Sequence, residues 1–229
     1  MKETTLGILL LLVIAISLPA CAAPLQYVIE PMEARVVDAT TKQPLERVVV
    51  VAHWELEHGT VGGNVPSGQL RVMETVTDKD GRFAFPGFGP ETLVNRFLVN
   101  RDPRLIIFKP GYEYRGLSNA YTSDRELRTR RERRSDWNGK TIELKPFAGT
   151  TREYAEHLDF MTTSLESVLF EECGWKKIPR MVLAVNGQSE IFRKNGLYGL
   201  PSIESLEIRY SNVRARCGSV KEFFRSYQP

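Results

Sequence analysis

The stretch Asp78-Lys79-Asp80-Gly81 places two carboxylates one residue apart before a glycine, which is how a calcium loop of the EF-hand type begins. Such a loop also needs further oxygen ligands and a glutamate at its twelfth position. Counted from Asp78, the twelfth position is Gly89, and positions six to nine read Phe-Ala-Phe-Pro. These residues cannot supply the missing ligands, so we predict a hairpin turn in which Gly81 takes a positive φ.

The three histidines of the chain, His53, His58 and His157, do not have the spacing of a metal site. His53 and His58 are five residues apart on a predicted strand, so their side chains point to opposite faces. The alternation puts His53 with Glu55 and Glu57 on a face that we expect to be solvated, while the residues between them face the core. His157 is expected to be a partly exposed structural histidine in a helix. No metal and no other cofactor is predicted.

The sequence also lacks the common catalytic motifs: it has no Gly-x-Ser-x-Gly, no phosphate loop and no dinucleotide fingerprint. No catalytic residue is therefore identified. The formal net charge of +3 is too small to favour a nucleic-acid partner.

One strongly charged segment, residues 124–134, carries six arginines and three acidic residues. Because guanidinium groups pair bidentately with phosphate, the segment is a candidate for contact with anionic lipid headgroups, lipopolysaccharide or another acidic surface. A solvated loop with internal ion pairs is the alternative, and both interpretations stay open. The residues assigned to the contact are Arg128, Arg130, Arg131, Arg133 and Arg134.

The N-terminus combines Lys2 with an apolar run from Leu6 to Leu18, which has the length of a secretory signal core rather than of a membrane span. The run ends in Leu-Pro-Ala-Cys at residues 18–21, which resembles the lipobox of bacterial lipoproteins. The resemblance implies cleavage before Cys21 and acylation of that cysteine. An ordinary signal peptide with an incidental cysteine is the alternative.

From this resemblance we expect residues 1–20 to be a lipoprotein signal peptide and residues 21–32 a tether or spacer. The mature chain is then held in the bacterial cell envelope through its N-terminal lipid. Ala22 after the acylated cysteine favours the outer membrane, with the protein facing the periplasm. In that oxidising compartment Cys173 and Cys217 are an even pair, so we predict a disulfide bond between them rather than two free thiols.

Residues 33–147 alternate with the period of strands, and polar or Gly-rich turns separate the runs. The segments 36–50 (VVDATTKQPLERVVV), 77–85 (TDKDGRFAF) and 105–112 (LIIFKPGY) together resemble the carboxypeptidase regulatory-like domain. The resemblance implies a transthyretin-like, antiparallel Greek-key β-sandwich of about seven strands. It covers about half of the mature chain.

Residues 148–229 have helical periodicity, so the predicted fold class is α+β, a β-sandwich followed by a helical C-terminal region. Thr150 and Glu153 form a capping box that begins the first helix, and its apolar stripe runs from Tyr154 to Val168. Further helices are predicted over 179–185, ending at Asn186-Gly187, over 202–209, and from a capping box at Ser219.

These features favour a non-enzymatic envelope lipoprotein, in which the sandwich is a binding or structural module for an envelope protein, peptide or glycan. The alternative is an envelope hydrolase with an unrecognised site between the sandwich and the helical region. A polar pocket with convergent acids or histidines favours the hydrolase, whereas a flat or grooved apolar patch favours binding.

Overall fold

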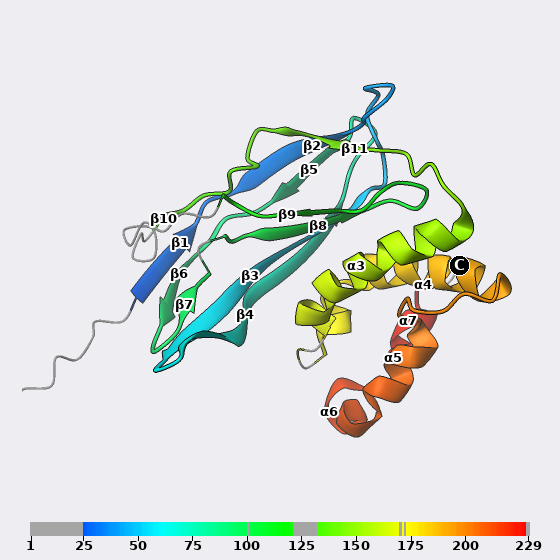
Figure 1. Ribbon diagram of the computed structural model, residues 1–229. Helices are drawn as coiled ribbons and strands as arrows, with labels where there is room; N and C mark the ends of the chain where they lie inside the picture. Colours follow the sequence, from blue (N-terminus) through cyan, green and yellow to red (C-terminus); the bar gives the residue numbers. More distant parts are fainter. Residues whose placement is uncertain (1–24, 100, 121–131, 170, 172, 228–229) are drawn as a thin grey trace, which may run out of the picture.

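The computed structural model describes residues 25–99, 101–120, 132–169, 171 and 173–227 (Figure 1). The fold is α+β, as predicted, with the strands in the first two thirds of the chain and the helices at the C-terminal end. The elements form three layers: a group of outer strands, a central sheet, and helices that cover part of the far side of that sheet.

The outer layer is built from two three-stranded sheets with the orders β10-β1-β6 and β11-β2-β5. Their strands are β1 (Leu25–Ile29), β2 (Met32–Asp38), β5 (Arg82–Phe85), β6 (Phe88–Leu93), β10 (Glu132–Arg133) and β11 (Thr141–Leu144). The pairs β10–β1 and β11–β2 are parallel, and the described residues contain eleven strands. The predicted antiparallel sandwich of about seven strands is therefore wrong in these two pairs and in its strand count.

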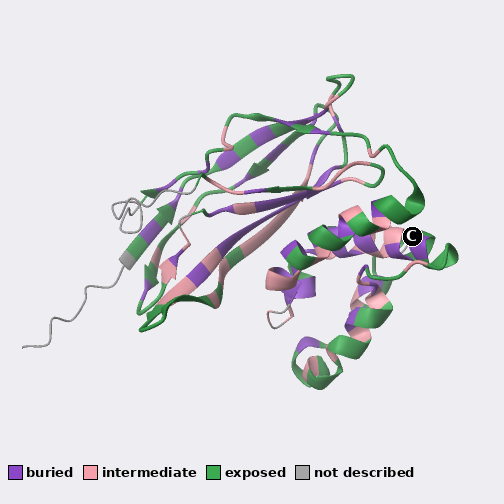
Figure 2. Ribbon diagram, in the orientation of Figure 1, coloured by how far each residue is buried: buried purple, intermediate pink, exposed green. Residues whose placement is uncertain are grey.

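The central sheet has the order β4-β3-β8-β9, and the short β7 also pairs with β3. Its strands are β3 (Val49–Thr60), β4 (Gly63–Val76), β7 (Phe97–Leu98), β8 (Arg104–Phe108) and β9 (Arg115–Leu117). Strand β3 is buried on both faces. Val50, Ala52 and Trp54 pack in the core between the strand layers, while Val49 and Val51 pack against the helices. Figure 2 shows buried residues in the strands and in the helices alike.

Asp78–Gly81 is a turn, as predicted, but it is not a hairpin turn, because β4 before it pairs with β3 in the central sheet and β5 after it pairs with β2 in the outer layer. One carboxylate oxygen of Asp78 accepts the backbone N–H groups of Asp80, at 2.9 Å, and Arg82, at 2.8 Å. Gly81 has φ +73°, and a Cβ at this position would lie 2.3 Å from the carbonyl oxygen of Val36. Both the left-handed backbone and the close approach of β2 require glycine.

The sandwich begins earlier than predicted. Leu25–Ile29 forms strand β1 between β6 and β10, and the Tyr27 side chain is completely buried. The assignment of residues 21–32 to a tether is therefore wrong from Leu25 onward. Tyr27 and Ile29 alternate with exposed neighbours and fill the core, so this segment is part of the fold.

The first of the predicted helices is α3 (Thr151–Leu169), which begins at the predicted capping box: Thr150 Oγ1 accepts the Glu153 N–H, and the Glu153 carboxylate accepts the Thr150 N–H at 2.7 Å. Its predicted apolar stripe from Tyr154 to Val168 is buried. The Tyr154 hydroxyl fixes the helix to the sandwich, because it accepts the Gly111 N–H and donates to the carbonyl oxygen of Tyr112.

The next helix, α4 (Pro179–Lys194), does not end at Asn186-Gly187, so that predicted boundary is wrong. Asn186 accepts the Ile203 N–H and donates to the Glu190 carboxylate, while Val185 and Phe192 continue the buried stripe. The predicted helices near 202–209 and after Ser219 are present. The remaining helical elements are η1 (Gly174–Lys176), α5 (Ile203–Arg209), η2 (Ser211–Val213), α6 (Arg214–Cys217) and α7 (Val220–Arg225).

The predicted disulfide bond between Cys173 and Cys217 is confirmed, with a Cα–Cα distance of 5.4 Å. It joins the segment after α3 to the end of α6 and so closes the helical layer. Across the part of the chain that the structure describes, none of the helices combines the length and the apolar character that crossing a membrane requires.

Candidate functional site

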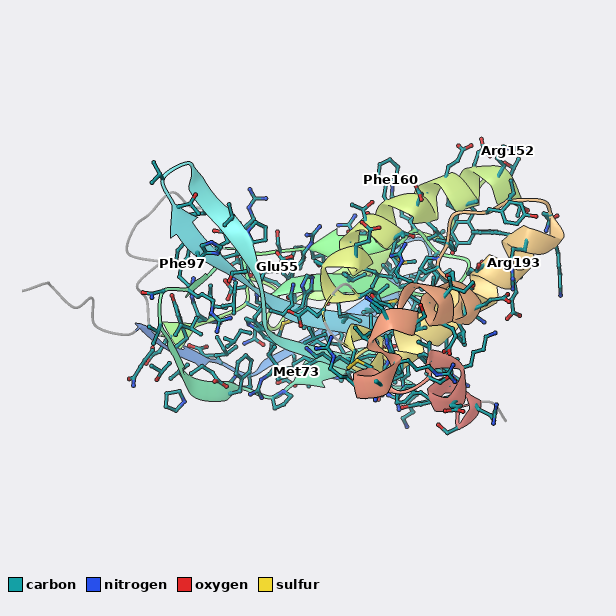
Figure 3. All side chains as sticks on the ribbon, turned by 90° about the horizontal axis from the view of Figure 1, so that it is seen from below. Glu55, Met73, Phe97, Arg152, Phe160 and Arg193 are labelled. Atoms are coloured by element: carbon teal, nitrogen blue, oxygen red, sulfur yellow. A yellow bond between two sulfur atoms is a disulfide. The ribbon has the colours of Figure 1, made fainter. Side chains whose placement is uncertain are left out.

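A pocket of about 530 Å³ lies on the side of the central sheet that faces the helices, toward the end of α3. Its floor is the second half of β3, where the alternation that placed Val49 and Val51 under the helices continues as His53, Glu55 and Glu57. Arg104 of β8 and Ser164 of α3 complete the polar lining. In Figure 3, Glu55 lies between Phe97, at the end of the molecule without helices, and the helical layer.

His53 is completely buried at the base of this pocket, so the prediction of a solvated face is wrong at this residue. Its Nδ1 lies 3.0 Å from Oε1 of Gln69, whose amide nitrogen donates to the carbonyl oxygen of Ser167 in α3. An amide oxygen can only accept, so Nδ1 carries the proton. Burial lowers the pKa of His53, against the opposing effect of Glu55, and the imidazole is therefore neutral.

Glu55 and Arg104 form the charged pair of the pocket. Arg104 Nη1 lies 3.8 Å from Glu55 Oε1, and Arg104 Nη2 donates to Ser164 Oγ at 3.5 Å. Both side chains are partly exposed, at 41% for Arg104 and 27% for Glu55, so each keeps hydrogen-bonding capacity for a ligand. Glu57 adds a second carboxylate on the same face of β3. The floor thus offers donors and acceptors side by side.

Asp102 forms the buried end of the pocket, with only 4% of its surface exposed. Neither of its carboxylate oxygens has a hydrogen-bond partner, and Arg133 Nη2 lies 3.9 Å from Oδ1. Burial raises the pKa of Asp102 to about 6, and the positive charge of Arg133 opposes that rise.

Arg133 was expected to contact an anionic surface, and the structure contradicts that expectation. The residue is buried in β10, donates to the carbonyl oxygen of Leu98 and lies over the ring of Tyr27. It is a structural cation that faces Asp102. Arg134 is exposed, as a surface contact requires. Arg128, Arg130 and Arg131 lie outside the described residues.

His157 has the structural role that was predicted for it. It is partly buried in α3, and its Nε2 accepts the backbone N–H of Tyr114 at 3.1 Å. Among the residues that the structure describes, no three His, Cys, Asp or Glu side chains are grouped so that they could hold a metal ion.

The pocket residues were not identified as a site from the sequence. The available signal was that His53, Glu55 and Glu57 interrupt one face of a strand whose other half is β-branched and buried on both sides. The sequence of β3 does not show how far the helical layer extends over that face, because this depends on how α3 packs.

No family model matches the chain, and no curated protein matches it. Among solved structures, it is similar over 55% of its length to 31% of a streptococcal ancillary pilin, with 12% identity and a TM-score of 0.25. It is also similar over 57% of its length to 63% of a 3-chlorocatechol 1,2-dioxygenase from Rhodococcus opacus, with 14% identity and a TM-score of 0.28. A third likeness is to the C-terminal domain of a shaft pilin from Lactobacillus rhamnosus, with 15% identity and a TM-score of 0.25; it covers 53% of this chain and 98% of that one. The chain thus spans less than two thirds of the first two structures, and likenesses this weak carry no information about activity or ligand.

Proposed function

We propose that this chain is a non-enzymatic, lipid-anchored binding protein of the bacterial cell envelope, and that the pocket on β3 holds a short polar segment of an envelope glycan or peptide. The observation that carries the proposal is the Glu55–Arg104 pair on the pocket floor. Both side chains are partly exposed, and 3.8 Å separates their charged atoms. Hydroxyl, amide or carboxylate groups of a ligand can therefore form hydrogen bonds to them, and neither charge is left without a partner.

The same geometry argues against catalysis by the buried histidine. His53 Nε2 has no hydrogen-bond partner and no solvent-accessible surface, so a substrate cannot reach it. The hydrolase alternative must therefore rest on Glu55 and Glu57, two carboxylates on one face of β3.

The sandwich is proposed to be a carboxypeptidase regulatory-like, transthyretin-like Greek-key domain. The three segments of the resemblance support this, because they coincide with structural units. Segment 36–50 runs from β2 through a turn into β3, segment 77–85 holds the turn at Asp78–Gly81 and β5, and segment 105–112 is β8 with its following turn.

Ligand binding is tested by titrating the purified mature domain with peptidoglycan fragments, lipopolysaccharide core oligosaccharides and short envelope peptides in a calorimeter. We expect Arg104→Gln to weaken binding about 10- to 100-fold, the loss of one or two charged hydrogen bonds. Arg152→Gln, an exposed change in the first turn of α3, is the control and should bind like the wild type. Equal binding by Arg104→Gln and wild type excludes this pocket, and turnover of a bound fragment establishes the hydrolase.

Lipid anchoring is tested by replacing Cys21 with serine in the full chain and labelling cells with a fatty acid. The wild type should take up label and stay with the outer membrane, whereas Cys21→Ser should be released. A membrane-bound, unlabelled Cys21→Ser protein contradicts the anchor.

Arg134, which is exposed, and Arg128, Arg130 and Arg131, which lie outside the described residues, remain proposed contacts to anionic lipid. Strand β10, which follows the segment, pairs in parallel with Val28 and Ile29 of β1, the strand that follows the N-terminal tether, and this supports the assignment. Changing Arg130, Arg131 and Arg134 to glutamine should weaken adsorption of the non-lipidated protein to anionic vesicles at low salt, because exposed charges are screened within about 10 Å at 0.1 M salt. Equal adsorption contradicts the contact.

A further inference from the structure

Two turns of the sandwich project at the end of the molecule where β1 begins (Figure 1). One is the tip of the β3–β4 hairpin, where Thr60 pairs with Gly63 and Val61 stands in the turn. The other is the β6–β7 turn, whose Val94 directly follows Leu93, the residue paired with Leu25 of β1. The helices α3 to α7 lie toward the opposite end of the molecule (Figures 1 and 3).

Both turns carry largely exposed aliphatic side chains. The exposed fraction is 111% for Val61 and 66% for Val94. Arg96, two residues after Val94, is also exposed and adds a cation to the same turn. Turns normally carry polar residues or glycine, so valine at both tips is a departure that packing within the chain does not explain.

The length of the tether brings these turns to the membrane. Leu25 is four positions after Cys21, and even a fully extended chain of that length spans at most about 14 Å. If Cys21 carries the lipid, as proposed above, Leu25 lies within that distance of the bilayer surface. Val94 lies one residue beyond Leu25 in the direction of the anchor, because β6 runs antiparallel to β1.

We infer that the β3–β4 tip and the β6–β7 turn form a bilayer-contact surface, which we call the tip surface and define by Val61, Val94 and Arg96. The valines enter the headgroup region and Arg96 faces lipid phosphate, while the helical layer points away from the membrane. The inference rests on lipidation of Cys21, but it adds a fixed orientation that lipidation alone does not require.

The experiment places an added tryptophan at Val61, at Val94 or, as a matched control, at Ile208, an exposed aliphatic residue in α5. The lipidated full chain is reconstituted into vesicles of phosphatidylcholine and phosphatidylglycerol, with or without bromine on the acyl chains, and flotation first establishes that it is bound. We expect brominated lipid to quench the emission of Val61→Trp and Val94→Trp at least twofold beyond the parent protein, and to leave that of Ile208→Trp unchanged.

Protein that floats with the vesicles but shows no added quenching at positions 61 and 94 overturns the tip surface and leaves the anchor standing. Equal quenching at position 208 overturns the orientation. Protein that neither floats nor carries lipid refutes the anchor, and the tip surface with it. The Cys21→Ser forms of the same variants should show no added quenching, because the short tether holds the tip surface at the bilayer.

Discussion

The carboxylate of Glu74, on β4, accepts a hydrogen bond of 2.7 Å from the backbone N–H of Met181 in the first turn of α4. Its second oxygen accepts the N–H of Arg180 at 2.9 Å. The N-cap residue of the helix is Ile178, which has no side-chain acceptor, so the sheet supplies the cap that the local sequence lacks. The negative charge also lies at the positive end of the helix dipole.

Replacing Glu74 with alanine should therefore lower the free energy of unfolding by about 1–2 kcal/mol, because two backbone donors lose their partner. Urea unfolding followed by circular dichroism measures the change. The control Glu156→Ala, at an exposed position of α3, should change stability by less than about 0.5 kcal/mol. If the two variants are equally stable, the cap contributes nothing.

Removal of the disulfide bond should destabilise the helical layer. Cys173 and Cys217 are 44 residues apart in sequence, and the chain-entropy model gives a loop of that size roughly 4 kcal/mol. We expect the double alanine variant to lose about 2–4 kcal/mol of unfolding free energy, and reductant to lower the stability of the wild type by a similar amount. Reductant should not affect the double variant, and a further loss there would contradict this account.

Arg133 and Arg134 are neighbours with opposite environments. Arg133→Gln leaves Asp102 buried without its cation, which should cost roughly 3–5 kcal/mol of unfolding free energy. Arg134→Gln changes an exposed side chain and should cost less than about 0.5 kcal/mol. Thermal and urea unfolding of the two variants measure this difference. Equal stability of the two variants would contradict the structural role of Arg133.

Stability should depend on pH through Asp102. Burial raises its pKa in the folded state to about 6 from 3.8, so the folded protein holds this proton more tightly than the unfolded chain does. Its contribution is therefore fully present below about pH 4 and is lost as the pH rises through about 6; the difference corresponds to about 3 kcal/mol. The Asp102→Asn variant should lack this slope, while the exposed Asp159→Asn control should keep it. Urea unfolding from about pH 4 to pH 8 tests this, and parallel curves for wild type and Asp102→Asn would contradict it.

The fold class and most local signals could be predicted from the sequence because they depend on nearby residues. The turn at Gly81, the cap at Thr150 and the stripe of α3 are each set within a few positions. Strand β1 was missed because the prolines at positions 24 and 31 on either side of it resemble a spacer, although Tyr27 and Ile29 alternate inward. Helix α4 passes through Gly187 because burial of Val185 and Phe192 outweighs the roughly 1 kcal/mol that glycine costs a helix.

The pocket could not be predicted in the same way, because its residues acquire their environments from elements far away in sequence. His53 is linked through Gln69 to Ser167 of α3, more than 100 residues later, and Gln69 reaches it only because β4 pairs with β3. Arg133 looks like its neighbours in an arginine-rich segment, and only the return of β10 beside β1 makes it a core residue.

The central sheet is buried on both faces, by the outer strands on one side and by the helices on the other. The eleven strands of the described residues all precede Thr151, so the sandwich can assemble before the helices have joined the fold. Until then, Val49, Val51, Ile106 and Phe108 form a bare apolar face, and the hydrophobic cluster to which they belong includes residues as late in the chain as Phe224. A nascent chain at that stage is a target for a chaperone, and truncation within the last helices should leave a folded but aggregation-prone sandwich.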